Sequence, residues 1–189
     1  MKDIFRGELV RLSYEDPVSL AKVDAQWQTD SEFQRLGDNQ AIFMTSEKRL
    51  REIYEKRVED GFKPGKFSFS IRTLDNDKLI GYLIMSWDLI HNDVMVGIGI
   101  GERGLWGKGF GTDAMKVCLQ YAFLELNVHR VSLGLHEYNP RALRSYEKAG
   151  FLLEGRTRKD LAREGMRYDS FWMGILREEW LRLQNGEST

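Results

Sequence analysis

Apolar residues recur along the chain at two different spacings. In residues 67–72 apolar and polar residues alternate, which is typical of a β-strand with one buried face. In residues 114–126 apolar residues recur three and four positions apart, which indicates one face of a helix. Such patterns predict strands over 8–12, 67–72, 79–87, 94–100, 131–135, 151–154 and 168–176. They predict helices over 19–28, from a cap at Thr45 or Ser46 to about residue 61, over 112–126 and over 141–149.

Turn residues join these segments in a consistent order. Residues 75–78 predict a tight turn that makes a hairpin of the strands on either side. Asn139 is suited to cap a helix, Pro140 to begin it, and Gly150 to follow its end. Between residues 94 and 135 the order strand, helix, strand predicts a right-handed parallel crossover, with ligand loops at the carboxyl ends of its strands. The expected fold class is α/β.

Length and composition agree with this class and exclude some partners. The chain has 189 residues, is 42% hydrophobic and 30% charged, and carries a net charge of −1. We expect one domain over residues 1–189. The chain has no excess of basic residues that would indicate binding to nucleic acid or to an anionic membrane. Residues 1–6 lack the apolar core of a signal peptide, and no apolar run approaches the roughly 18 residues that span a bilayer. A soluble cytoplasmic protein is expected.

Few residues indicate redox or metal chemistry. Cys118 is the one cysteine, and its place among helix-spaced apolar residues predicts a core position rather than a nucleophile. His91, His129 and His136 do not have the spacing of metal ligands. No disulfide and no metal site are therefore expected.

A glycine-rich loop precedes the helix that is expected from residue 112. Glycine reaches backbone angles that other residues avoid and lets an anion approach the main chain. The unpaired N–H groups and the dipole of the helix that follows add to such a site. The loop therefore predicts a phosphate-binding site. Its residues are Trp106, Gly107, Lys108, Gly109, Phe110, Gly111 and Thr112.

Three other interpretations of these glycines can be weighed. Residues 99–104 match the dinucleotide pattern G-x-G-x-x-G, but the following glycines keep the next turns out of helix, and the nearest suitable acid, Glu125, comes late. A Walker loop ending at Gly107 and Lys108 lacks its first glycine and has Gly109 where Ser or Thr is required. A glycine-rich turn without a ligand stays open as the third interpretation.

A second motif covers residues 139–151, with the sequence NPRALRSYEKAGF. Together with the preceding strand, glycine loop, helix and strand, it resembles the GNAT acetyltransferase superfamily. Within that superfamily, the chain is similar to the ribosomal-protein N-acetyltransferase (RimJ/RimL-like) group. The resemblance extends over nearly the whole chain, including residues 7–12 and 174–180, and its middle is more specific than its ends.

The resemblance implies a fold and a cosubstrate. The fold is a mixed, mostly antiparallel seven-stranded sheet flanked by helices, in which the parallel fourth and fifth strands splay apart. Acetyl-CoA lies in the gap, its pantetheine arm bonding the fourth strand near Ile98, Gly99 and Ile100, and its pyrophosphate bonding the backbone of residues 107–112. The family often has Gln or Arg where this chain has Trp106, and little effect is expected because the loop works through main-chain donors.

Helix 141–149 and its cap carry the remaining cosubstrate residues that the resemblance implies. Asn139 bonds the pantetheine arm, or only caps the helix. Tyr146 lies near the thioester sulfur, or is only a half-buried aromatic residue. Lys148 reaches a CoA phosphate, although a solvated lysine is the simpler interpretation.

The expected chemistry is direct attack of a neutral amine on the thioester, without a covalent acyl-enzyme. A backbone N–H of the fourth strand stabilises the oxyanion, and Tyr146 gives a proton to the leaving thiolate. The fourth strand, residues 94–100, contains no carboxylate to act as base. Glu137 and, second to it, His136 are the nearest candidates, and a solvent-facing charge is an equally good interpretation of Glu137.

The acceptor follows from the same chemistry. An α-amino group, with a pKa of about 7.7–8.0, is partly neutral at pH 7, whereas a lysine-type amine near 10.4 is not. We therefore expect a protein N-terminal amine first, and a small polyamine or antibiotic amine second. A non-catalytic acyl-CoA sensor and a nicotinamide-dependent enzyme are the alternatives from other classes.

Specificity is expected from the first two helices and from loops in the 60s and in the 150s to 160s. Scattered acids could attract a cationic amine, although such acids are usually only a solvated face. The resemblance also implies a homodimer or higher homo-oligomer. The acids are Asp24, Asp30, Glu32, Asp38 and Asp88.

Overall fold

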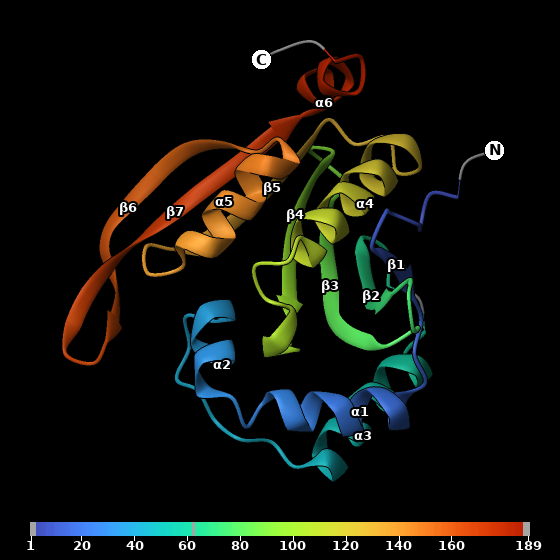
Figure 1. Cartoon of the computed structure of the whole chain (residues 1–189), viewed down its shortest axis with the longest axis vertical. Helices are drawn as coiled ribbons and strands as arrows, with labels where there is room; N and C mark the ends of the chain where they lie inside the picture. The colour runs from blue at the N-terminus through green and yellow to red at the C-terminus, as the bar shows by residue number, and fades with distance from the viewer. Residues whose placement is uncertain (1–2, 62, 187–189) are drawn as a thin grey trace.

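Seven strands form one mixed sheet in the order β1-β2-β3-β4-β5-β7-β6 (Figure 1). The structure is a computed structural model that describes residues 3–61 and 63–186. Every neighbouring pair is antiparallel except β4 and β5. The sheet confirms the expected fold. The strands are β1 (Val10–Ser13), β2 (Lys66–Thr73), β3 (Leu79–Asp88), β4 (Asp93–Ile100), β5 (Arg130–His136), β6 (Leu152–Arg163) and β7 (Met166–Leu176).

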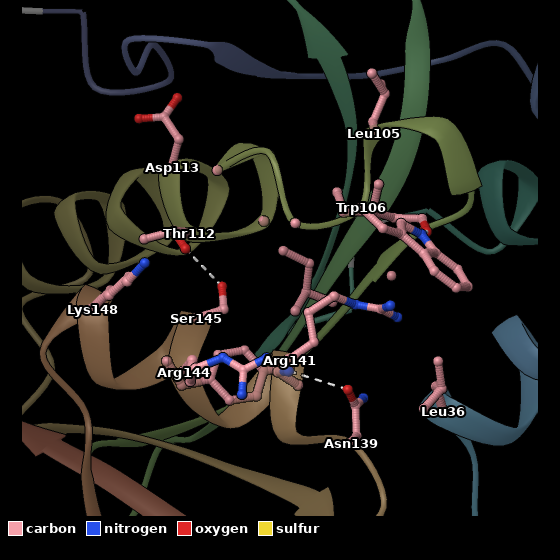
Figure 2. A pocket seen from close by; sticks show the side chains of 18 of the residues that line it. Leu36, Leu105, Trp106, Thr112, Asp113, Asn139, Arg141, Arg144, Ser145 and Lys148 are labelled. Atoms are coloured by element: carbon pink, nitrogen blue, oxygen red, sulfur yellow. Dashed lines mark hydrogen bonds between the residues drawn. The ribbon is translucent and has the colours of Figure 1, made fainter.

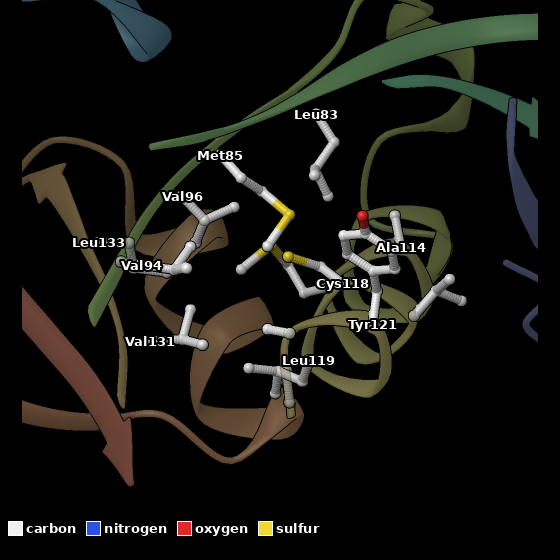
Figure 3. Packing of buried hydrophobic residues seen from close by; sticks show 14 of the residues in the cluster. Leu83, Met85, Val94, Val96, Ala114, Cys118, Leu119, Tyr121, Val131 and Leu133 are labelled. Atoms are coloured by element: carbon white, nitrogen blue, oxygen red, sulfur yellow. The ribbon is translucent and has the colours of Figure 1, made fainter. Parts of the chain in front are cut away.

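Helices lie on both sides of this sheet. The packing face of α4 is buried against β3, β4 and β5, where Met85, Val96 and Val131 surround Cys118 and Leu119 (Figure 3). Burial raises the pKa of the Cys118 thiol to about 12, which agrees with a core role. The helices are α1 (Pro17–Trp27), α2 (Ser31–Gly37), α3 (Glu47–Glu59), α4 (Phe110–Leu124), α5 (Pro140–Ala149) and α6 (Arg177–Gln184), with a short 3-10 helix η1 (Arg103–Leu105).

Three local predictions were wrong. Helix α2, which Asp30 caps, was not expected because its seven residues are too few to show a helical period. The segment expected as a loop in the 150s to 160s is part of a long hairpin: β6, expected to end at residue 154, continues to Arg163, and its mostly exposed residues do not alternate in hydrophobicity. Helix α4 begins at Phe110 and includes Gly111, which was expected to stay outside it. Gly111 is tolerated there because first-turn N–H groups need no helical partner.

The splay between β4 and β5 is visible in the strand register. The two strands pair only at Asp93, Val94 and Met95, opposite residues 130–132. Beyond Met95 each strand keeps only its antiparallel neighbour, β3 or β7. The N–H of Gly101 donates a hydrogen bond to the carbonyl of Ile80. Along an antiparallel strand every second residue points its backbone N–H and C=O at the same neighbour, so the backbone groups of Gly99 also point toward β3. The backbone groups of Ile98 and Ile100 therefore face the gap.

Asp113, in the first turn of α4, holds the N-terminal segment against the glycine loop. Its buried carboxylate accepts the N–H groups of Glu8, Leu9 and Val10 at 3.1, 2.8 and 2.9 Å. Asp113→Ala should lower the free energy of unfolding by about 2–4 kcal/mol, because three backbone donors, one buried and two partly buried, lose a charged acceptor. Urea unfolding measures this loss. Glu125→Ala, which removes an exposed acid at the other end of α4, should change it by less than about 0.5 kcal/mol, and an equal effect of both would contradict the prediction.

Candidate active site

A cavity of about 470 Å³ opens where β4 and β5 diverge, between the glycine loop, α5 and the end of α2 (Figure 2). It brings together most residues expected to bind the cosubstrate. Lys108 is exposed outside the cavity, and Phe110 packs on the core. The expected residues that line the cavity are Ile98, Gly99, Ile100, Trp106, Gly107, Gly109, Gly111, Thr112, Asn139, Tyr146 and Lys148.

The glycine loop presents free main-chain donors to this cavity. Gly107 and Gly109 have φ angles of +74° and +93°, which L side chains rarely adopt. Gly109 is the N-cap residue of helix α4 and supplies no side-chain cap. Among the described residues, none accepts a hydrogen bond from the N–H groups of residues 107 and 109–112. Unpaired donors at a helix N-terminus fit the pyrophosphate of acetyl-CoA.

Lys148 was expected near these donors, whereas two further basic residues, Lys116 and Arg144, were missed by the sequence reasoning. Lys116 on α4 and Arg144 and Lys148 on α5 line the same cavity as the glycine loop (Figure 2). Thr112 and Ser145 join the two helices by a hydroxyl hydrogen bond of 2.8 Å. The signal in the sequence was the spacing of four from residue 144 to residue 148, which places both cations on one helix face. They supply positive charge where phosphates would bind.

Trp106 has a larger role than the sequence suggested. Its indole N–H donates to the carbonyl of Ile100 at 2.6 Å, and the guanidinium of Arg141 lies 4.0 Å from its ring centroid. Arg103 lies 4.9 Å from the same ring and forms ion pairs with Asp30 and Glu32 around α2. The side chain that departs from the family pattern therefore links the glycine loop to β4. The N–H of Ile100 is therefore still available to a ligand, as are the N–H and the carbonyl of Ile98.

Tyr146 lies in the cavity on the face of α5 that looks toward β4. Its half-buried ring packs on Phe151 with centroids 6.2 Å apart. Burial, with a smaller contribution from Tyr82, raises the pKa of Tyr146 to about 12. Asn139 caps α5 through its Oδ1, which accepts the N–H of Ala142 at 3.1 Å, and its amide NH₂ donates to none of the described residues. A protonated phenol and a free amide donor thus share the cavity.

The two base candidates lie outside this cavity. The carboxylate of Glu137 accepts the N–H of Asp169 at 2.9 Å and lies 3.8 Å from Arg156. It is therefore turned toward β7, although the sequence placed it beside Asn139. His136 also ends β5 away from the cavity lining, and its buried Nδ1 has no hydrogen-bond partner within residues 3–61 and 63–186. Burial, then the charge of Arg163, lowers the pKa of His136.

Comparison with known proteins identifies the family. The sequence profile of the acetyltransferase (GNAT) domain matches residues 6–152, which is well over half of the chain. The chain belongs to the GNAT acetyltransferase family. It is 34% identical over 132 residues to the probable N-acetyltransferase YjcK of Bacillus subtilis, covering 68% of this chain and 70% of that protein. It is 35% identical over 85 residues to the putative ribosomal N-acetyltransferase YdaF of the same organism, covering 42% of this chain and 46% of YdaF.

Solved structures agree with the GNAT fold. A spermidine N-acetyltransferase from Vibrio cholerae in complex with CoA and spermine superposes with a TM-score of 0.75 and 24% identity, over 91% of this chain and 96% of that one. A GNAT-family acetyltransferase from Bacillus anthracis gives a TM-score of 0.75 and 19% identity, over 92% and 98%. Family membership makes the protein an acetyl-CoA-dependent acyltransferase that modifies an amine.

Two kinds of feature are absent from the described residues. No helix within residues 3–61 and 63–186 is long and apolar enough to cross a membrane. Over the same part of the chain, no three or more His, Cys, Asp or Glu residues are grouped so that they could hold a metal ion.

Proposed function

We propose that this protein transfers the acetyl group of acetyl-CoA to a primary amine by direct attack in a ternary complex, with a protein N-terminal α-amino group as the first acceptor class. One arrangement carries the proposal. The open edge of β4 at Ile98 is bounded by the uncapped start of α4 and by the Tyr146 hydroxyl. A thioester cosubstrate that lies along this edge has donors for its pyrophosphate at the loop and a proton donor near its sulfur.

Each group has a defined role in the proposed reaction. Acetyl-CoA supplies the activated acetyl group. As the acceptor nitrogen bonds the carbonyl carbon, a backbone N–H at the open edge of β4 stabilises the oxyanion. When the carbon–sulfur bond breaks, Tyr146 donates its phenolic proton to the sulfur and regains one from the acceptor nitrogen through solvent. Asn139, through its free amide, holds the pantetheine arm in this geometry, and Arg144 and Lys148 bind phosphate oxygens.

The acceptor class rests on the absence of a dedicated base. The acids that line the cavity, Glu8 and Asp113, lie beside the glycine loop, and Glu137 is held by β7. An α-amino group needs less help than a lysine-type amine, because part of it is neutral at pH 7. The likeness to YdaF supports a RimJ/RimL-like place in the family. One domain carrying both substrate sites is part of this proposal.

A small polyamine is the second candidate acceptor. The specific observation in its favour is the similarity of fold to an enzyme that was crystallised with CoA and spermine. Self-association and a cytoplasmic location stay predictions.

Acetyl-CoA should raise the thermal midpoint of the protein, and this result tests the proposal first. Ligand at 100 times its dissociation constant adds about 2.7 kcal/mol of stability, or about 5–10 °C for a chain of this size. NADH and ATP are the controls and should have little effect. An amine screen follows, beginning with short peptides that have a free N-terminus and with spermidine. A midpoint shift without acetylation of any amine would favour the sensor interpretation instead.

A further inference from the structure

Helix α2 forms the wall of the cavity that faces away from the expected phosphate end. Phe33, Leu36 and Gly37 of α2 line the cavity. Leu36 lies across the cavity from Thr112 and Lys148, which border the end where the cosubstrate phosphates are proposed to bind (Figure 2). Once a cosubstrate occupies the glycine loop and the edge of β4, α2 is therefore the wall that an acceptor would contact.

This wall reaches the open end of β4 through Tyr82. A Cβ built on Gly99 of β4 would lie 3.0 Å from the Tyr82 hydroxyl oxygen, and one built on Gly37 of α2 would lie 3.9 Å from the same atom. The ring of Phe33 packs edge-on against the ring of Tyr82, with centroids 6.4 Å apart. Gly99 adjoins Ile98, at the edge along which the thioester cosubstrate is proposed to lie. A change in the position of α2 would thus change the space beside the reacting end of the gap.

Arg103 fixes the N-terminal end of α2. Its guanidinium donates to both carboxylate oxygens of Asp30, at 2.9 and 2.6 Å, and forms an ion pair with Glu32. Asp30 caps α2 by accepting the N–H groups of Glu32 and Phe33. Arg103 lies in η1, directly before the glycine loop, and its guanidinium is 4.9 Å from the ring centroid of Trp106. The first turn of α2 is thereby tied to the loop that is proposed to bind the pyrophosphate.

Tyr138 fixes the other end of α2. Its hydroxyl donates to the carbonyl of Arg35 at 2.6 Å, in a partly buried position. Tyr138 immediately precedes Asn139, the cap of α5 whose amide is proposed to hold the pantetheine arm. Arg163, near the tip of the β6–β7 hairpin, adds hydrogen bonds to two carbonyls just beyond the helix, at 2.9 and 2.8 Å. Each end of α2 is therefore tied to a segment that is proposed to contact the cosubstrate.

We propose that Arg103 and Tyr138 are positioning residues that hold α2 as the acceptor wall of the cavity, an inference that rests on the proposed function. Because the two ties come from the two cosubstrate-binding segments, they set the distance between this wall and the thioester from both sides. Small displacements matter, since the acceptor nitrogen must come within about 3–3.5 Å of the thioester carbon before it can attack. Both residues act through α2 and not on the reacting atoms.

A merely structural role of these residues predicts a different result. The side chain of Arg103 is 55% exposed, and ion pairs of exposed side chains contribute little to stability. Tyr138→Phe loses one hydroxyl, while the ring keeps its edge-on contact with Tyr168, at 5.1 Å between centroids. If these contacts served only stability, both variants would have a slightly lower thermal midpoint and unchanged kinetics. Loosening of α2 instead weakens acceptor binding selectively.

Arg103→Gln and Tyr138→Phe should each raise the KM for the acceptor about three- to tenfold, the range expected when one or two hydrogen bonds are lost. The acceptor is whichever of spermidine and a short peptide with a free N-terminus the wild-type enzyme acetylates faster. The dissociation constant of acetyl-CoA, measured by calorimetry, should change by less than about twofold, because the main-chain donors of the glycine loop remain in place. Hydrogen exchange followed by mass spectrometry should be faster in residues 31–37 of both variants and unchanged in α4.

Two comparisons decide whether the effect passes through α2. Arg51→Gln removes a similarly exposed ion pair, with Glu55 on α3, and should leave the acceptor KM and the exchange of residues 31–37 unchanged. Glu32→Gln should raise the acceptor KM in the wild-type background and have little further effect in Arg103→Gln, because both changes break the same ion pair. An equal effect of Glu32→Gln in both backgrounds would overturn the role of Arg103.

Failure of this inference and failure of the proposed function can be told apart. An unchanged acceptor KM in Arg103→Gln or Tyr138→Phe would overturn the role of that residue. A raised KM without faster exchange in residues 31–37 would also overturn it, because the effect would then not pass through α2. Absence of acetylation by the wild-type enzyme would overturn the proposed function and this inference with it.

Discussion

Tyr146→Phe should lower kcat for amine acetylation by about 100-fold or more, the usual loss when a positioned general acid is removed. The ring packs on Phe151 and the side chain lines the cavity, so the substitution removes one oxygen atom without leaving a hole in the core. Steady-state kinetics with a saturating acceptor measure the effect. The dissociation constant of acetyl-CoA, measured by calorimetry, should change by less than about twofold.

The pH dependence gives an independent check of the same role. Because burial raises the pKa of Tyr146 to about 12, the folded enzyme retains this proton over the range of about pH 7 to 10. A folded-state pKa above the unfolded one stabilises the protein below about pH 10, and this contribution is lost as the pH rises toward 12. A fall of wild-type kcat with a midpoint near pH 8 or 9 that disappears in Tyr146→Phe would contradict this.

Replacing both Gly107 and Gly109 with alanine should raise the dissociation constant of acetyl-CoA about 100-fold. An alanine in the left-handed region costs about 1–2 kcal/mol. In the free double variant the loop therefore relaxes to another backbone conformation at both positions. Binding of acetyl-CoA must then restore the strained conformation. About 1.4 kcal/mol at each position corresponds to tenfold at each. Calorimetry with acetyl-CoA measures the change.

The matched control uses two glycines of the same backbone conformation elsewhere. Gly61 and Gly165 have φ angles of +69° and +74°, and a Cβ at either would meet nothing within 4 Å. Their double alanine variant should lose similar stability and bind acetyl-CoA as the wild type does. If both double variants weaken binding equally, general destabilisation is the cause, and the glycine loop is not the phosphate site.

Local signals in the sequence predicted much of the fold. The cap, first turn and end of α5 depend on Asn139, Pro140 and Gly150, each of which has a preference that neighbours seldom override. The core face of α4 and the strands of the central sheet followed from periodicity. Helix α2 and the extension of β6 beyond residue 154 did not, because the helix is too short and the extension too exposed to show a period.

The candidate site was predictable from the sequence only where its expected function depends on main-chain groups. The glycine loop could be located because the role proposed for it, binding phosphate through main-chain N–H groups, depends on backbone conformation and not on side chains. Side-chain roles depend on direction, which tertiary contacts decide: Glu137 turns to Asp169, and the indole of Trp106 turns to Ile100. Asp24 looked like one of several surface acids, and only the packing of α1 on its neighbours shows that it is buried.

The divergence of β4 and β5 also bears on how the protein behaves without its cosubstrate. A sheet normally has unpaired edges only at its two outer strands, whereas here β4 presents a third edge from Val96 to Ile100. Proteins usually protect such edges, since an exposed edge can pair with a strand of another molecule. In the proposed binding mode the pantetheine arm covers this edge. We therefore expect the empty enzyme to aggregate more readily than the CoA-bound enzyme, so that CoA itself serves as a protective ligand during purification and storage.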